Sequence, residues 1–158
     1  IMDDRVKNDH SIKDFQGNGR DDSSPRIIRG RGAIAGVAEG PAMISRQTIT
    51  GWDGIDIHTG VVKEPGHPLQ GLSIRGSILI LDGSKGSNGW SIFFHAAQVS
   101  GAGPAALVFP RLDSRTAVTA AVLNVPTVTD LEADIFALIR PGERLRVDGE
   151  AGSIEVIG

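Results

Sequence analysis

Residues 77–89 read SILILDGSKGSNG, and this stretch decides the fold class. Ile78 to Leu81 form an uninterrupted apolar run of strand length, which is typical of a strand buried on both faces of a sheet. The three glycines that follow allow a sharp turn. Residues 91–100 then place apolar side chains at helical spacing, and Gly101 is suited to end that helix. The stretch therefore predicts a buried strand, a glycine-rich loop and a helix in succession.

The sequence on either side of this stretch predicts mostly short strands broken by glycine. Expected strands cover residues 27–34, 37–45, 105–109 and 126–129, and a hairpin joins 143–147 to 153–157. A helix is expected after Asp130, which can act as its N-cap, with apolar positions from Leu131 to Ile139. Because the helices are few, we expect a mixed α/β fold with a barrel-like mixed sheet and a few packed helices.

The chain of 158 residues has room for one compact domain, which we place at residues 26–158. Residues 1–25 are rich in Asp, Asn, Lys, Ser and Gly, and they bury too little apolar area to offset the entropy of ordering. They are either a disordered leader or an arm that docks on a partner, with Ile12 and Phe15 as anchors.

Composition argues against several classes of function. The formal net charge is −3 and the chain has no basic stripe, so nucleic acid is not an expected partner. No apolar run approaches the roughly 20 residues that span a bilayer, and the first residues do not form a secretory leader, so we expect a cytoplasmic protein without a membrane partner. Cysteine is absent, which excludes disulfides and any metal cluster held by thiolates of this chain.

The loop of residues 83–89 has the features of an anion site. Its glycines allow the backbone to approach a ligand, and the following helix would point free N–H groups at the same space. Lys85 adds positive charge, and Ser84, Ser87 and Asn88 add hydroxyl and amide groups. The glycine spacing fits neither a Walker loop nor a dinucleotide fingerprint. A carboxylate or phosphate site and a plain capped turn both remain possible on the sequence alone.

Other polar residues carry weaker signals. No Ser-His-Asp set can be assembled from the spacing of the four histidines. Asp53, Asp56 and His58 are close in sequence, but their spacing is not specific for a metal, and solvated turn residues are the simpler interpretation. Arg75 is either a carboxylate clamp or an ordinary turn charge.

Several segments, in order, resemble the small subunit or fused small domain of the aconitase X family. They are WDGIDIHTGV (residues 52–61), HPLQGLSIRG (67–76), the loop 83–89, GAGPAALV (101–108) and NVPTV (124–128). The resemblance covers about residues 26–158. It implies a swivelling β/β/α domain that closes over the active site of a larger subunit.

The resemblance also implies a reaction, which is loss of water from a hydroxy acid. The larger partner, and not this chain, would hold an iron–sulfur cluster. The bacterial heterodimers of the family act on cis-3-hydroxy-L-proline, which is the substrate expected first, and archaeal relatives dehydrate mevalonate 5-phosphate. Two further alternatives are a hydratase-isomerase subunit of the aconitase or isopropylmalate type and a non-catalytic anion-binding module.

The family pattern places a serine base in the loop, and Ser87 falls on its position. The resemblance therefore implies Ser87 as the catalytic base. The candidate substrate-binding residues are Gly86, Asn88, Lys85 and Gly89 of the loop, together with Arg75. The chain departs from the pattern at Lys85, where arginine is common, and at Asn88, where a second serine is usual. Trp90 stands where a small residue is usual, and an indole over the pocket would favour a small ring such as hydroxyproline.

Overall fold

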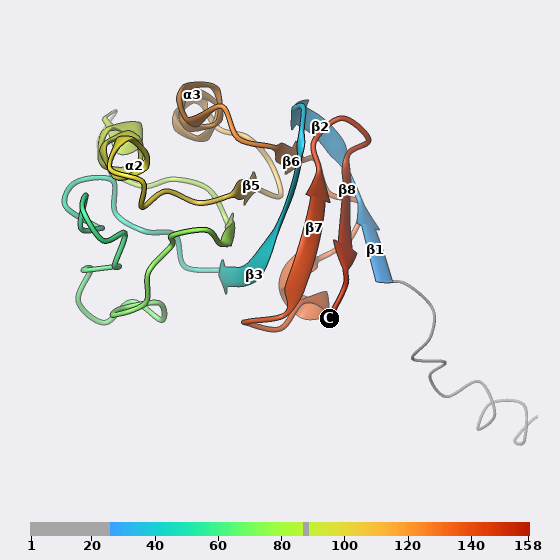
Figure 1. The fold of residues 1–158 in the computed structure, drawn as a ribbon, viewed down its shortest axis with the longest axis horizontal. Helices are drawn as coiled ribbons and strands as arrows, with labels where there is room; N and C mark the ends of the chain where they lie inside the picture. Colours follow the sequence, from blue (N-terminus) through green and yellow to red (C-terminus); the bar gives the residue numbers. More distant parts are fainter. Residues whose placement is uncertain (1–25, 87–88) are drawn as a thin grey trace, which may run out of the picture.

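The computed structural model describes residues 26–86 and 89–158, so the predicted N-terminal segment 1–25 and residues 87–88 lie outside it. Eight strands form one sheet in the order β1-β8-β7-β3-β4-β5-β6-β2 (Figure 1). Their bounds are β1 Arg26–Arg29, β2 Arg31–Ile34, β3 Val37–Ser45, β4 Ile78–Leu81, β5 Ala106–Val108, β6 Thr127–Thr129, β7 Arg144–Asp148 and β8 Ser153–Val156. The predicted strands are confirmed, except that the predicted strand 27–34 is divided at Gly30 into β1 and β2, which pair with different strands.

The order of the strands requires the sheet to roll into a barrel-like shape. Strands β1 and β2 stand at opposite ends of the order, but only Gly30 separates them in the chain. The two edges must therefore meet. Strands β3, β4, β5 and β6 are parallel neighbours, whereas the other pairings are antiparallel. The predicted mixed, barrel-like sheet is thus confirmed.

Glycines form the line along which the rolled sheet meets itself, which we call the seam (Gly30, Gly32, Gly149 and Gly152). A Cβ atom on Gly149 would lie 1.8 Å from the carbonyl oxygen of Ile34, and one on Gly32 would lie 2.0 Å from that of Gly149. The Gly30 N–H donates to the carbonyl of Gly152 at 2.8 Å. Backbone meets backbone here with no room for a side chain.

Two hydrophobic clusters lie on the two faces of β4. Ile78 and Ile80 belong to the cluster inside the barrel, and Leu79 and Leu81 belong to the cluster beneath the helices. Alternate residues of a strand point to opposite faces. All four side chains are buried, which explains why the sequence of this strand is apolar throughout.

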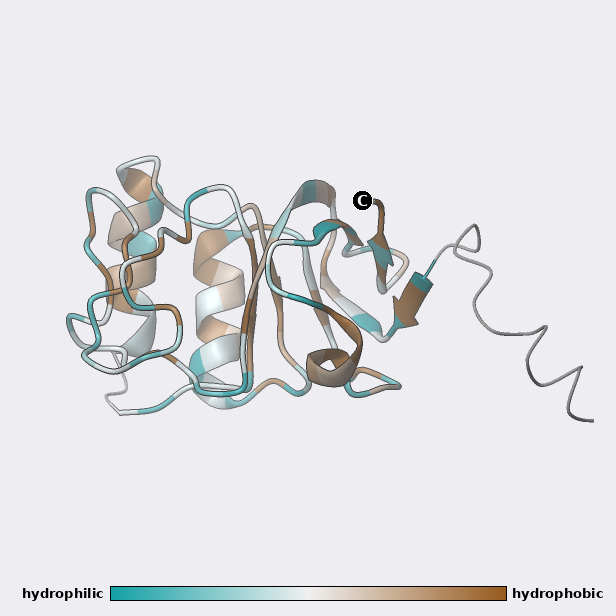
Figure 2. Ribbon diagram, turned by 90° about the horizontal axis from the view of Figure 1, so that it is seen from below, coloured by the Kyte–Doolittle hydropathy of each residue, from teal (hydrophilic) through white to brown (hydrophobic). Residues whose placement is uncertain are grey.

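The described residues contain three helices, α2 Trp90–Val99, α3 Ser114–Leu123 and α4 Ile135–Leu138. Helices α2 and α3 lie side by side on one face of the sheet, and the loops of residues 46–76 lie beside α2 in both views (Figures 1 and 2). Helix α2 confirms the predicted helix after the loop. None of the three has the length and apolar character needed to cross a membrane.

Two features of the helices differ from prediction. Helix α3 was not predicted; it begins with a capping box, in which Asp113 accepts from the Thr116 N–H and the Thr116 side chain accepts from the Asp113 N–H. The predicted cap at Asp130 is wrong, because Asp130 ends β6 with φ of +50° and pairs with Arg31 instead. Asp134 is the N-cap, and α4 is accordingly short.

Candidate functional site

The loop of residues 82–89 lies at the carboxyl end of β4, between the neighbouring parallel strands β3 and β5. In open parallel sheets, ligands bind in the crevice outside the carboxyl ends of the strands. Residues 46–50 follow β3 and residues 109–113 follow β5, so both segments emerge beside the loop. The topology therefore builds a polar edge from three connections, which we call the carboxyl edge.

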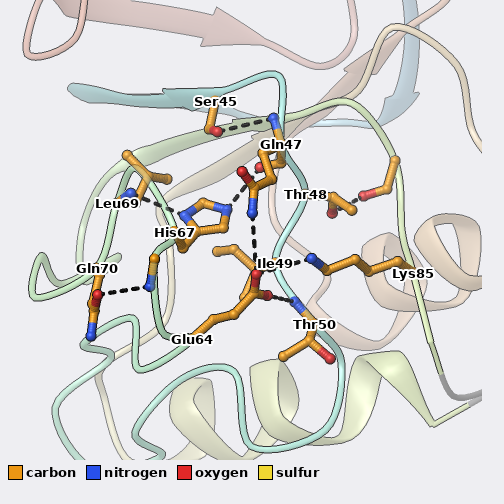
Figure 3. Close-up of polar contacts among 12 residues, drawn as sticks. Ser45, Gln47, Thr48, Ile49, Thr50, Glu64, His67, Leu69, Gln70 and Lys85 are labelled. Carbon is orange, nitrogen blue, oxygen red and sulfur yellow. Dashed lines mark hydrogen bonds and ion pairs between the residues drawn. The ribbon is translucent and has the colours of Figure 1, made fainter.

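Lys85 is held by an ion pair with Glu64. Its Nζ lies 2.9 Å from Glu64 Oε2, and the Glu64 side chain is only 13% exposed. The other carboxylate oxygen, Oε1, accepts from the backbone N–H of Thr50 at 2.6 Å, and Gln47 Nε2 also donates to Oε2. Figure 3 shows Glu64 and Lys85 pointing toward each other with Thr50 between their backbones. The positive charge of Lys85 is therefore already neutralised within the chain.

The Glu64 carboxyl has a pKa below its ordinary value of 4.5. Burial by itself would raise this pKa, but the hydrogen bonds from Lys85 and from the Thr50 N–H outweigh burial and lower it. Glu64 is thus a fixed negative charge between the segment after β3 and the loop after β4.

His67 supports the same segment and is not free to activate a nucleophile. The ring is buried; its Nδ1 accepts from the Leu69 N–H at 3.0 Å, and its Nε2 lies 2.8 Å from the carbonyl oxygen of Gln47. Since Nδ1 is an acceptor, Nε2 carries the proton and donates. A structural role in this turn therefore accounts for both nitrogens of His67.

Two more hydrogen-bonded contacts hold the first residues of the loop. Ser84 donates from both its backbone N–H and its hydroxyl to Asp113 Oδ2, at 3.1 and 2.9 Å. The Thr48 hydroxyl donates to the carbonyl of Gly83. Burial would raise the pKa of the Asp113 carboxyl, but hydrogen bonds from Thr116 and Ser84 hold this pKa below its usual range. Residues 83, 84 and 85 are thus each fixed to a different segment.

Gly86 is exposed and is the last residue of the loop that the structure describes before Ser87. Its φ is +84°, which favours glycine, and among the described residues a Cβ there would meet Thr50 Oγ1 at 3.8 Å. The candidate base Ser87 and its neighbour Asn88 lie outside the described residues, so their predicted roles stay predictions. Gly89, the N-cap residue of α2, closes the loop.

Trp90 anchors the far end of the loop in the core and does not cover a pocket. It is fully buried, packs against Phe94 and Phe109, and donates from Nε1 to the carbonyl of Ile49 at 2.8 Å. The expectation that Trp90 narrows the pocket is therefore wrong, because the first turn of α2 directs its side chain beneath the helix. The sequence-based reason for preferring a small ring is removed with it.

Arg75 does not lie near the loop in the structure. It precedes β4, whereas the loop follows β4, so the two lie at opposite ends of that strand. Arg75 borders a different pocket, of about 340 Å³, with Met43, Leu69, Leu72 and Pro141 among its apolar residues. Its role as a carboxylate clamp stays a prediction for which this arrangement offers no support.

A second pocket, of about 350 Å³, opens at the carboxyl edge itself. It is lined by Asp82 and Gly83 after β4 and by residues 110–113 after β5. Arg111 is exposed, and its guanidinium makes no hydrogen bond or ion pair with another described residue. Sequence reasoning missed Arg111, although it occupies the place after β5 that Ser84 occupies after β4.

The acidic residues near Trp52 are engaged in local contacts. Asp53 pairs with Lys63 at 2.7 Å, and Asp56 Oδ1 accepts from the N–H groups of His58 and Thr59. These two hydrogen bonds lower the pKa of the Asp56 carboxyl. In the part of the chain that the structure describes, no three His, Cys, Asp or Glu residues are grouped to hold a metal. An iron–sulfur cluster does not fit this chain, because the thiolates that hold such clusters are absent from its sequence.

A rolled mixed sheet that carries a glycine-rich loop at the carboxyl edge and helices on one face defines a swivel-type domain. The chain belongs to the aconitase X swivel domain family, whose pattern it matches over residues 27–156.

The similar proteins include small subunits from archaea. The chain is 35% identical to the phosphomevalonate dehydratase small subunit of Pyrococcus furiosus, over 82% of this chain and 95% of that protein. It is 36% identical to the protein of the same name from Methanocella arvoryzae, over 82% and 98%. A crystal structure of Thermococcus kodakaraensis aconitase X in its holo form contains a chain that superimposes with a TM-score of 0.77 at 27% identity, covering 84% of this chain and 99% of that one. The predicted family is confirmed, whereas the cis-3-hydroxy-L-proline type is not.

Proposed function

We propose that this chain is the small subunit of a two-chain hydro-lyase of the aconitase X type, and that its substrate is a phosphorylated hydroxy acid of the mevalonate 5-phosphate kind. The observation that carries the proposal is the loop 83–89, fixed at the carboxyl edge in a chain that belongs to the aconitase X swivel domain family. The names of the archaeal relatives support this substrate over cis-3-hydroxy-L-proline, and the buried Trp90 leaves no reason to expect a small ring.

In this proposal, Ser87 removes a proton from the carbon next to the substrate carboxylate. The hydroxyl group on the adjacent carbon leaves, so that a carbon–carbon double bond and water are formed. A hydroxyl is a weak base and needs a field that stabilises its alkoxide. The N-terminus of α2 supports such a field, because the positive end of the helix dipole follows directly after the loop. The large subunit would bind the rest of the substrate and any iron–sulfur cluster.

The contacts of Lys85 and Ser84 indicate that these two residues have a different role from the rest of the loop. Both side chains are engaged with Glu64 and Asp113, so they fix the loop rather than bind the substrate directly. Arg111 supplies the cation at this edge for an anionic substrate group, since its guanidinium has no partner among the described residues. This assignment leaves, among the described residues, one unpaired cation at the edge, beside Asp82 and Asp113, although the Lys85 charge is neutralised.

The test is to produce the chain with the large-subunit protein encoded beside its gene and to follow loss of water from mevalonate 5-phosphate and from cis-3-hydroxy-L-proline. We expect turnover of the phosphorylated acid, and we expect Ser87→Ala to lower kcat by about 10² to 10⁴-fold, the usual contribution of a general base. Ser100→Ala, an exposed serine at the other end of α2, is the matched control. Turnover of hydroxyproline alone would overturn the substrate, and near-normal turnover of Ser87→Ala would overturn the base.

A further inference from the structure

Trp52 is a large aromatic side chain that is held in place although it is exposed. Its side chain is 67% exposed, and the edge of its ring system meets Phe93 of α2 at a centroid distance of 5.1 Å and an interplanar angle of 80°. Edge-to-face pairs of this kind stabilise a defined ring orientation. An exposed tryptophan that is already ordered loses little conformational entropy on binding, which is a property of interface anchors.

The same framework carries Trp52 and the loop. The residue before it, Gly51, is buried against Trp90, and a Cβ at Gly51 would lie 2.6 Å from the Trp90 Cα. The residue before that, Thr50, donates its N–H to the Glu64 carboxylate that also holds Lys85. Trp52 is therefore two residues away from the segment that also holds Lys85 of the loop.

The side chains near Trp52 are of the kinds found in protein–protein interfaces. Ile92, next to Phe93 in α2, is a second exposed apolar side chain near this position, at 56%. The ion pair of Asp53 with Lys63 borders it with charge. An apolar centre with a polar rim is the usual anatomy of a protein–protein contact.

We propose that Trp52, supported by Phe93, is the anchor by which this chain binds the large subunit beside the substrate. The inference rests on the proposed function. It assigns to the large subunit an apolar pocket that accepts an indole, on the surface that faces the loop. A second copy of this chain is a poorer occupant, because pairing through Trp52 would cover the loop that must reach the substrate.

The test is to measure the Kd of the two subunits, and kcat at saturating large subunit, for the wild-type chain, for Trp52→Ala and for a control. Val99→Ala is the control, because Val99 is 77% exposed at the opposite end of the same helix. We expect Trp52→Ala to raise Kd by about 30-fold or more, as truncation of an interface hot spot does. We expect kcat at saturation to stay within about twofold, and Val99→Ala to change Kd by less than about threefold.

Three outcomes separate this inference from its alternatives. An unchanged Kd with a lowered kcat would show that Trp52 acts on the substrate, and it would overturn the inference. Self-association of the wild-type chain that Trp52→Ala abolishes would assign the surface to a second copy and would also overturn it. If the wild-type chain does not bind the large subunit at all, the proposed function fails, and the inference fails with it.

Fluorine NMR gives a measurement that does not depend on how Trp52→Ala folds. The chain has two tryptophans, and Trp90 is fully buried, so 5-fluorotryptophan labelling should give two signals that Trp52→Phe assigns. We expect unlabelled large subunit to shift the Trp52 signal and to remove its difference between H₂O and D₂O. A Trp52 signal that keeps this difference in the assembled complex would overturn the inference.

Discussion

The barrel seam and the carboxyl edge both depend on glycine, but for opposite reasons. At the seam, Gly149 is needed because the backbone of Ile34 leaves no space for a methyl group. At the carboxyl edge, a Cβ on Gly86 would make only an ordinary contact of 3.8 Å with Thr50 among the described residues, and glycine is favoured there because its φ is +84°. The seam is closed by backbone contacts, whereas the edge is held by side chains that come from distant parts of the chain. The space around the glycine therefore distinguishes Gly149 of the seam from Gly86 of the carboxyl edge.

The largest expected effect is at the seam. Gly149→Ala would place a methyl group 1.8 Å from the Ile34 carbonyl oxygen, and backbone atoms cannot yield as a flexible side chain can. We expect a loss of more than about 3 kcal/mol of unfolding free energy in urea titration, beyond the usual range for overpacking. The control is Gly66→Ala, which meets no atom within 4 Å and has φ of +75°. Its expected cost is the backbone strain alone, about 1–2 kcal/mol, and equal costs would contradict the distinction.

The next effect tests where the loop is anchored. Trp90→Ala removes a fully buried side chain from the cluster beneath the helices, and we expect a loss of about 3–5 kcal/mol in thermal or urea unfolding. Trp52→Ala is the matched control, because that side chain is mostly exposed. It should lower the stability of the isolated chain by no more than about 1.5 kcal/mol, the contribution of its edge-to-face pair with Phe93. Comparable losses for both variants would show that the two indoles are not divided between core and surface.

A smaller loss of stability is expected when Asp113 is replaced, and comparison with turnover distinguishes its capping role from its contact with the loop. Asp113→Ala removes the N-cap of α3 and both hydrogen bonds to Ser84, and it should lower stability by about 0.5–2 kcal/mol and also lower turnover. Asp134→Ala removes the N-cap of α4 and the ion pair of Asp134 with Arg46, but no hydrogen bond to a described residue of the loop. A similar loss of stability without a change in turnover is expected there. If both variants lower turnover alike, the Ser84 contact has no role of its own.

The smallest expected effect is the pH dependence due to Glu64. Because the pKa of this carboxyl is lowered in the folded chain, its contribution to stability is present above the ordinary value of 4.5 and is lost as pH falls through the lowered folded-state pKa. The difference in unfolding free energy between the wild-type chain and Glu64→Gln should be about 1 kcal/mol at pH 7, since Lys85 is partly exposed, and should shrink toward pH 3. A difference that grows in acid would contradict this sign.

Much of the fold could be predicted because its signals are local. The apolar run before the loop, the hairpin around Asp148 and the helix ended by Gly101 each depend on residues close in sequence. Helix α3 was missed because residues 114–123 mix alanine with β-branched residues, and its capping box uses Asp113 and Thr116 instead of the more familiar serine and glutamate. Asp130 and Asp134 are equally good caps by sequence, and only the geometry after β6 decides between them.

The candidate site was predictable in position but not in its contacts. Strand, glycines and helix locate the loop, yet the pairing of Lys85 with Glu64 joins residues 21 apart, and the pairing of Ser84 with Asp113 joins residues 29 apart. Such pairs depend on which strands are neighbours. Trp90 shows the same limit, because one position along a helix decides whether an indole covers a pocket or enters the core.

The pairing of the first strand with the last has a consequence for how this domain can be joined to others. In the β1–β8 pair, Arg26 lies opposite Val156, so the two strands that begin and end the fold share one edge of the barrel. In Figure 1 this edge lies on the side away from α2. A polypeptide joined at either strand, or a short linker that joins both in a circular permutant, would leave the carboxyl edge unobstructed. The same domain can therefore be used as a separate chain or as part of a longer one without change to its site.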